Sequence, residues 1–324
     1  MINFLCSLPP AFILIIGAIL VPFLKGKLRH AYVIMLPILT LIHIVQLTPE
    51  STFVFPFLTY ELSMLRVDTW SQLFGYIFCL SATAAFIYSI YQKKSVEFVS
   101  ALLYIGSALG VVFSKDIVSL YLFWEVLAIA SVILVLARKT KSAYNAGIRY
   151  IIVHIFGGLV LLAGIVLYIS QTGSITFEHF TDVNLATTLI LIGFLVNAAV
   201  VPFSSWLPDA YPESSVFGGV ILSTYTTKTA VYALIRGFPG WEILIVLGLA
   251  MSIYSIVYAL IENDIRRVLA YSVINQVGFK VCAVGIGSPL ALAGAAAHVF
   301  AGVIYNGVLD RKSTRLNSSH QIIS

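Results

Sequence analysis

The sequence predicts an all-α, polytopic membrane protein built as one bundle of transmembrane helices. Hydrophobic residues make up 60% of the 324 residues and charged residues only 10%, with a mean hydropathy of +0.98. Soluble domains carry about 25% charged residues. Apolar segments of the length that a membrane-crossing helix needs, about 20 residues, follow one another along the chain. We therefore expect about eleven spans and no separate soluble domain.

The spans are expected at 8–24, 29–47, 69–92, 96–114, 116–137, 144–170, 185–203, 215–236, 240–262, 264–286 and 288–309. The first is interpreted as a retained span, because no basic stretch and small-residue cleavage site mark a signal peptide. Pro202 lies near the end of the seventh segment. Proline removes a backbone donor and interrupts a helix, so one broken helix is expected there.

Basic residues indicate the orientation of the bundle. They gather after the first, third, fifth and ninth spans, at Lys25, Lys27, Arg29, Lys93, Lys94, Arg138, Lys139, Lys141, Arg266 and Arg267. Loops rich in Lys and Arg stay on the cytoplasmic side of a membrane. The pattern predicts a multi-pass protein of the cell inner (plasma) membrane with its N-terminus outside.

The end of the chain differs in composition from the rest. Residues 1–309 are expected to form the transmembrane bundle, and 310–324 read DRKSTRLNSSHQIIS, a polar tail. One interpretation is a natural polar tail. The other, which we favour, is a truncated or wrongly joined reading frame, because the last span would be left with a polar face and no further helix to cover it.

Glu125 is the first candidate functional residue. It lies near the middle of the apolar segment IVSLYLFWEVLAIASVILVLA. A carboxylate at that depth costs roughly 2.5–3.5 kcal/mol on insertion scales, and intramembrane acids usually mark ion or proton pathways. The structural alternative is a glutamate that only hydrogen-bonds a neighbouring hydroxyl group.

Lys228 is the natural cationic partner for Glu125. It lies inside the apolar segment SVFGGVILSTYTTKTAVYALI, flanked by Thr226, Thr227 and Thr229. Burial favours the neutral amine and a nearby carboxylate favours the ammonium, so such a lysine can exchange a proton. Snorkelling to the interface is the alternative, and the distance from the span ends argues against it. The sequence predicts a buried Glu125–Lys228 ion pair.

Three further polar residues are candidates for a proton relay. His154 and His298 can take up and release protons near neutral pH, but each could equally be a hydrogen-bonded packing residue. Asn197 lies five residues before Pro202 and could line a hydrated path beside the broken helix, or could simply stabilise the kink. Lys280, inside the tenth span, receives no role from the sequence.

Several classes of chemistry find no support in the sequence. The cysteines Cys6, Cys79 and Cys282 are scattered through apolar segments without metal-ligand or disulfide spacing. No nucleotide-binding loop, haem-binding histidine pair or hydrolase triad is recognisable. We therefore expect no cofactor and no metal site, and redox chemistry by this chain alone is not expected. The basic balance reflects membrane topology, not nucleic-acid binding.

Four segments carry a resemblance to a known family: FWEVLAIAS, PFSSWLPDAYPE, TTKTAVYALIRGFPG and DIRRVLAYSVINQVG. In this order they resemble the proton-translocating antiporter-like subunits, which include the D-type subunit of Mrp Na+/H+ antiporters and the related membrane subunits of respiratory complex I. The resemblance runs from about residue 68 to 309, and a member of the D type fits best.

The resemblance implies a role for particular residues. Glu125 matches the family's membrane glutamate, and Lys228 matches a lysine after the broken helix. Asn197 stands where the family usually has a lysine. The family pattern HxxxHxxxK falls on His298, Gly302 and Asn306, of which only the first keeps the family residue. The family's later helices, with another titratable residue, have no counterpart here.

The function implied is proton translocation coupled to Na+ or another cation, by a transporter component of a multisubunit antiporter with other membrane subunits as partners. A second hypothesis is a proton-pumping membrane-arm subunit of a respiratory NADH:quinone oxidoreductase or hydrogenase-type complex. A third is a non-conducting assembly scaffold, which Asn197 and Gly302 keep open.

Overall fold

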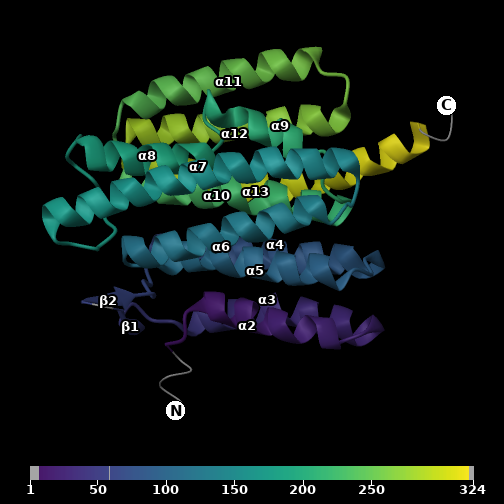
Figure 1. The fold of residues 1–324 in the computed structure, drawn as a ribbon, viewed down its shortest axis with the longest axis horizontal. Coiled ribbons are helices and arrows are strands. Elements are labelled where there is room, and N and C mark those ends of the chain that lie inside the picture. The colour runs from purple at the N-terminus through teal and green to yellow at the C-terminus, as the bar shows by residue number, and fades with distance from the viewer. Residues whose placement is uncertain (1–6, 58, 321–324) are drawn as a thin grey trace. The chain divides into compact units, whose positions relative to one another are not determined.

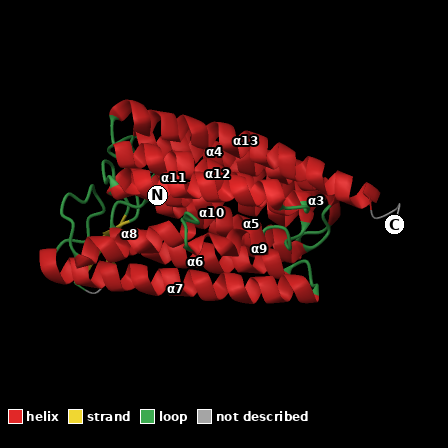
Figure 2. Cartoon of the chain, turned by 90° about the horizontal axis from the view of Figure 1, so that it is seen from above, coloured by secondary structure: helices red, strands yellow, loops and turns green. Residues whose placement is uncertain are grey.

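The computed structural model describes residues 7–57 and 59–320, with side chains up to residue 305. Most of this part of the chain is helical (Figure 2). The helices are α2 (Pro10–Leu20), α3 (Gly26–Gln46), α4 (Thr69–Tyr88), α5 (Ser95–Phe113), α6 (Ile117–Leu136), α7 (Lys141–Thr172), α8 (Leu185–Asn197), α9 (Trp206–Ala210), α10 (Val216–Gly237), α11 (Ile243–Ile261), α12 (Ile265–Ile286) and α13 (Pro289–His320), with short 3₁₀ turns at Val21–Phe23, Ser89–Tyr91 and Phe203–Ser205.

The predicted all-α transmembrane bundle is confirmed, since each of the eleven predicted spans coincides with a helix. Within the described residues, seven helices are long and apolar enough to cross a membrane, and α2, α8 and α13 contribute shorter apolar helices. The remaining span, α10, is less apolar because it carries a run of Ser, Thr and Lys at its centre. That helix is nevertheless buried almost throughout.

Two features were not predicted. An antiparallel hairpin of β1 (Val54–Phe57) and β2 (Tyr60–Ser63) stands between α3 and α4, with Val54 paired to Ser63. The backbone of α13 also continues as a helix to His320, past the expected end of the last span at residue 309. A polar stretch can stay helical, because helix propensity does not require apolar side chains.

The described chain divides into two compact units. Unit 1 comprises 1–133, 158–178 and 182–190, and unit 2 comprises 134–157, 179–181 and 191–324. In unit 1, α2 packs against α5 and α3, and α4 packs against α3 and α5 (Figure 1). In unit 2, α12 is the central helix and contacts α9, α10, α11 and α13.

Helix N-termini in unit 1 are fixed by aspartates. The Asp68 carboxylate accepts from the backbone N–H of Ser71 at 2.9 Å, and the Ser71 hydroxyl accepts from the Asp68 N–H. Asp116 likewise accepts from the backbone N–H and the hydroxyl of Ser119 before α6. These caps satisfy N–H groups that the first turn of a helix cannot pair internally. Burial raises the pKa of the Asp116 carboxyl, and the bonds from Ser119 oppose that shift.

The outer surface of α11 shows why this chain needs lipid or partner subunits around it. Apolar side chains on this helix are widely exposed, including Val246, Ile253 and Leu260, the last at 81%. By contrast α10 buries the hydroxyl groups of Thr226, Thr227 and Thr229. Apolar residues outside and polar residues inside fit a helix bundle solvated by hydrocarbon.

Glycines allow α11 and α12 to approach closely in unit 2. A Cβ at Gly248 would lie 2.5 Å from both the Cys282 backbone nitrogen and the Gly278 carbonyl oxygen, and a Cβ at Gly278 would lie 2.8 Å from the Gly248 oxygen. Small residues at such contacts are the usual means of close helix packing in membranes. Backbone atoms cannot rotate away, so a larger residue must separate the helices.

Gly248→Ala is therefore expected to destabilise unit 2 by about 1–3 kcal/mol, the usual cost of overpacking. The measurement is the midpoint of thermal unfolding in detergent. Gly294→Ala in α13 is the matched control, because a Cβ there meets nothing within 4 Å. Equal midpoints for the two variants would contradict the prediction.

Candidate functional site

Glu125 lies in unit 1 on α6, with its carboxylate against α7. A Cβ at Gly158 would come within 2.2 Å of Glu125 Oε1, so only glycine leaves room for the carboxylate in this position. Among the described residues, buried Oε1 has no hydrogen-bond partner. The lack of a partner at this oxygen gives no support to the alternative of a glutamate bonded to a neighbouring hydroxyl group. The oxygen remains available to accept a proton.

Lys228 lies in unit 2 near the middle of α10 and is 1% exposed. This burial excludes the snorkelling alternative. Its ammonium group donates to the backbone oxygen of Ser223, five residues earlier on the same helix. Thr227 and Thr229 beside it have buried hydroxyl oxygens without a hydrogen-bond partner in the described part of the chain. The lysine thus sits in a polar interior where a water molecule could bridge neighbouring groups.

The broken helix is present where it was expected. α8 ends at Asn197, and the chain passes Pro202 and the turn at Phe203–Ser205 before α9 begins. Ala199 has φ 55°, in the left-handed region that ends a helix. The indole N–H of Trp206 donates to the Val196 backbone oxygen at 3.0 Å. The same oxygen accepts from the Ala199 backbone N–H at 3.1 Å, so Trp206 supplies a second donor to a carbonyl group at the break.

His154 packs against this break in unit 2. Its ring stacks on Tyr150 with centroids 3.9 Å apart and meets Trp206 edge to face at 4.7 Å. Nδ1 lies 2.9 Å from the Tyr150 carbonyl oxygen, so Nδ1 must carry the hydrogen of that bond. Nε2 is buried and has no partner among the described residues. His154 is therefore both a packing residue and a base with one nitrogen available to take a proton.

Trp206→Phe should lower stability by about 0.5–1.5 kcal/mol, because the buried Val196 carbonyl oxygen loses one of its two donors and keeps the Ala199 N–H. The readout is the thermal unfolding midpoint in detergent. Trp241→Phe is the matched control: its indole also donates to a backbone oxygen, that of Phe180 at 3.0 Å, but this residue is only part-buried. Water can replace that donor, so a smaller loss is expected. Equal losses would contradict this account of the break.

Asn197 is the last residue of α8 and is 2% exposed. Its side-chain Nδ2 has no hydrogen-bond partner within the described residues. The carbonyl at the break is satisfied by Trp206 instead, so the Asn197 nitrogen does not hold the kink. An unsatisfied buried amide is costly unless water reaches it, which keeps the predicted role of Asn197 beside a hydrated path.

His298 on α13 is half-buried, and its ring lies 6.4 Å from that of Phe279 on α12. Four residues on, Gly302 is buried beside Lys280 of α12: a Cβ there would lie 3.4 Å from Lys280 Nζ. The side chain of Asn306 lies outside the described residues. His298 therefore lies on the same helix as Gly302, the residue beside Lys280. Lys280 is the lysine to which the sequence assigns no role.

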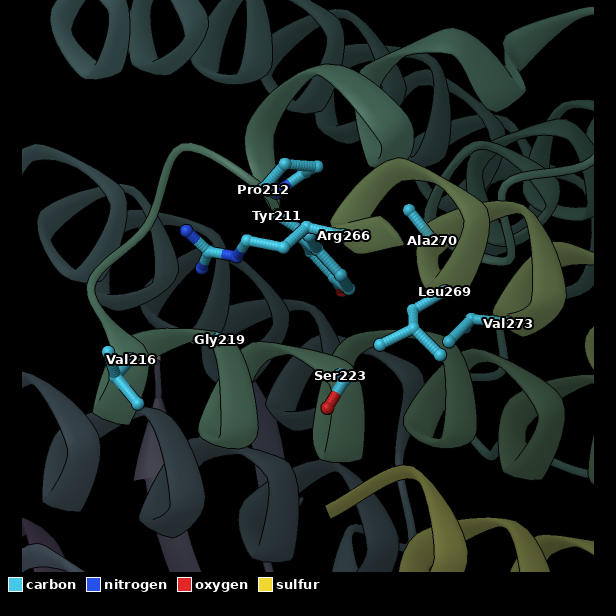
Figure 3. Close-up of a pocket in the computed structure, with 9 residues that line it drawn as sticks. All are labelled: Tyr211, Pro212, Val216, Gly219, Ser223, Arg266, Leu269, Ala270 and Val273. Carbon is cyan, nitrogen blue, oxygen red and sulfur yellow. The ribbon is translucent and has the colours of Figure 1, made fainter. Parts of the chain in front are cut away.

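A small cleft in unit 2 lies between α10, α12 and the segment that follows α9 (Figure 3). Its lining residues are Tyr211, Pro212, Val216, Gly219, Ser223, Arg266, Leu269, Ala270 and Val273. Arg266 lies over Gly219, with 3.5 Å between its Nη2 and a Cβ at that position, and donates to the Ser214 carbonyl oxygen at 3.1 Å. The cleft reaches Ser223, whose backbone oxygen holds Lys228.

Two ion pairs fasten the connector that carries α9. Arg149 Nε lies 2.9 Å from Asp209 Oδ2, and Arg138 Nη1 lies 3.2 Å from Glu213 Oε2. Each is partly exposed, so each contributes at most about 1 kcal/mol.

The predicted site residues divide between the two units. Unit 2 holds Lys228, His154, Asn197, His298 and Lys280. Glu125 belongs to unit 1, and its pairing with Lys228 stays a prediction.

Residues 114–309, more than half of the chain, match the family described as NADH:quinone oxidoreductase/Mrp antiporter, TM. The chain is 28% identical over 308 residues to the A-type subunit of the Na(+)/H(+) antiporter of Alkalihalophilus pseudofirmus, a match covering 84% of this chain and 38% of that protein. It is 29% identical over 225 residues to the D-type subunit from the same organism, covering 62% and 44%. The chain thus spans less than half the length of these curated relatives.

Two solved structures share the fold. A chain of an archaeal respiratory membrane complex, the membrane-bound sulfane sulfur reductase, superposes with a TM-score of 0.82 at 25% identity, covering 93% of this chain and 55% of that one. A chain of the Mrp complex from Dietzia sp. gives 0.85 at 23% identity, covering 96% and 37%. With the matched motifs and the broken helix, these findings place the chain in the NADH:quinone oxidoreductase/Mrp antiporter family of transmembrane subunits.

Proposed function

We propose that this chain translocates protons as a subunit of a multisubunit Na+(cation)/H+ antiporter. Its membership of the family and its relatives, named as Na(+)/H(+) antiporter subunits, support a transporter role. The observation that carries the proposal is the fully buried Lys228, held in an apolar span by a backbone oxygen. Intramembrane ionisable residues by default mark a proton or ion pathway.

The mechanism proposed is a charge switch between Glu125 and Lys228. With Glu125 ionised, its negative charge stabilises the Lys228 ammonium. A proton taken up by Glu125 removes that attraction, and the lysine gives its proton to water or to His154 Nε2. Release of the Glu125 proton and reprotonation of Lys228 reset the site. One proton enters and one leaves, so charges and atoms balance.

The cleft beside α10 is the proposed access path to Lys228. It is lined by Arg266, which the basic-loop pattern assigns to the cytoplasmic side, and by Ser223, whose oxygen holds the lysine. Protons or hydronium would then reach the lysine from the cytoplasm. From Lys228, the stations proposed within unit 2 are His154, next to the broken helix, Asn197 at its end, and His298.

A redox-driven membrane complex is the second candidate. The likeness to a chain of an archaeal respiratory membrane complex, at 25% identity, favours it. In that case the partner subunits would carry the redox groups and this chain would only move protons. The Glu125–Lys228 switch would be the same in both cases, and the energy source would differ.

The test is proton flux in proteoliposomes that contain this chain with its partner subunits. A pH-sensitive dye trapped inside the vesicles reports proton movement after Na+ is added outside. Exchange without an electron donor would support the antiporter. Proton movement only with an electron donor would support the redox-driven complex. No flux under either condition would refute both and leave an assembly scaffold.

A further inference from the structure

Lys280 is a buried cation that the proposed mechanism does not use. It lies on α12 and is 1% exposed. Its Nζ has no hydrogen-bond partner in the part of the chain that the structure describes. A buried ammonium without a partner is costly, and at this depth the side chain does not reach the interface. A purely structural role therefore does not account for a lysine here.

The amine of Lys280 lies where a side chain at position 302 would stand. A Cβ at Gly302 would be 3.4 Å from Lys280 Nζ, 3.7 Å from Gln276 Oε1 and 3.8 Å from the Tyr305 hydroxyl. Three polar groups thus converge on one glycine from two helices. Because Gly302 has no side chain, the position that a Cβ would take lies at ordinary contact distance from all three groups, and a polar lining of this kind favours bound water.

Titratable side chains are found on all four of the helices that pack against α12. α10, which packs against α12 and α13, carries Lys228, and α13 carries His298 one helical turn before Gly302. α13 also carries Tyr305, and α9 carries Asp209, which pairs with Arg149. On α11 the only titratable side chains are tyrosines. Lys280 therefore lies on a helix that packs against both of the helices that carry these two proposed proton carriers.

We propose that Lys280 is a proton-carrying station between Lys228 and His298, and that it takes the place of the side chain missing at Gly302. The neutral amine accepts a proton from hydronium or from the imidazolium of His298, so one N–H bond of the lysine forms while an O–H or imidazole N–H bond breaks. The ammonium then gives the proton to a water molecule on the Lys228 side, so one N–H bond breaks and one O–H bond forms. The inference rests on the proposed proton translocation. It adds to it a titratable residue on α12, whereas the family pattern has a titratable residue at position 302.

The first test is exchange by Lys280→Met in the assembled complex in proteoliposomes. Loss of a proton carrier should lower the exchange rate by about 100-fold, within the usual range for proton-transfer groups. Because methionine removes a buried unpartnered charge, the thermal unfolding midpoint should stay equal or rise. A lysine with a structural role would lose stability along with exchange. The exposed Lys93→Met is the control and should change neither quantity.

Recovery of exchange by a second substitution is the more specific test of the proposal. The double variant Lys280→Met with Gly302→His places an imidazole in the same space and should recover at least about one tenth of the exchange rate. Recovery would support the proposal. Wild-type exchange by Lys280→Met, with Glu125→Gln inactive, would overturn the Lys280 station and leave the proposed function standing.

Water access is tested without transport. In a background lacking Cys6, Cys79 and Cys282, Lys280→Cys is treated with a water-soluble methanethiosulfonate reagent, whose thiol-reactive sulfur forms a mixed disulfide and releases sulfinate. Modification is expected, whereas Val299→Cys, at a fully buried apolar position, should stay unmodified. If the wild-type complex moves no protons, the proposed function fails separately, and this arm still decides whether the space beside Gly302 is hydrated. No reaction at Lys280→Cys would overturn the Lys280 station.

Discussion

Glu125→Gln is expected to abolish proton-coupled cation exchange while the complex still assembles. Glutamine keeps the size of glutamate but cannot take up a proton, so the charge switch has no first step. Oε1 has no hydrogen-bond partner among the described residues, so the substitution breaks no bond at that atom and folding should be preserved. The measurement is Na+-driven proton flux in proteoliposomes, with assembly checked by size-exclusion chromatography.

Lys228→Ala should have the same effect, and the double variant should be no worse than either alone. Groups that act as one unit give non-additive losses. Glu125→Asp is the matched control, because it keeps the carboxylate and should retain part of the exchange. Wild-type flux in either single variant would remove the pair from the mechanism. Additive partial losses would show two independent sites and contradict the switch.

The proximity of this pair can be tested directly. With the native cysteines removed, Glu125→Cys and Lys228→Cys together should form a cross-link with a short bifunctional maleimide, seen as altered mobility after proteolysis between the two sites. Each single variant, Glu125→Cys or Lys228→Cys alone, is the control and should give none. Failure of the pair to react would exclude a direct ion pair.

The fold was predictable because hydropathy is a local property of the chain. Each apolar segment of sufficient length became a helix, and Pro202 marked the break. The β1–β2 hairpin escaped notice because its two four-residue strands are short, and one contains Pro56. The sequence beyond residue 309 is not apolar, so hydropathy alone did not predict that the helix continues there.

The candidate site was only partly predictable. Glu125 and Lys228 stand out as charges within apolar segments, and the burial of Lys228 and of Glu125 Oε1 is a consequence that the sequence can anticipate. The roles of Trp206, Gly158 and Gly302 depend on contacts between residues far apart in the chain. Trp206 satisfies a carbonyl ten residues earlier, and Gly302 matters because Lys280 comes from another helix. A glycine opposite a buried charge is a signal that could have identified Gly158 and Gly302. To use that signal, however, one must already know which helices pack against each other.

Gly158→Ala is the second substitution with a large expected effect, and it should separate activity from stability. The added Cβ would lie 2.2 Å from Glu125 Oε1 and 3.0 Å from its Cδ. These atoms end a flexible side chain, so the carboxylate moves and the helices stay in place. Alanine inside a helix is more favourable than glycine by about 0.5–1 kcal/mol, so the thermal unfolding midpoint should hold or rise. Exchange should fall by up to about 100-fold, since a misplacement near 1 Å has that effect on positioned groups.

Two comparisons make the Gly158 result decisive. In Gly157→Ala the new Cβ meets Val196 at 2.9 Å, a stiff β-branched side chain, so stability should fall. The double variant Gly158→Ala with Glu125→Asp shortens the acid and gives the carboxylate room, and should exchange faster than Gly158→Ala alone. If Gly158→Ala exchanged at the wild-type rate, the position of the Glu125 carboxylate against α7 would be irrelevant to transport. Loss of stability together with exchange would instead make Gly158 a packing residue.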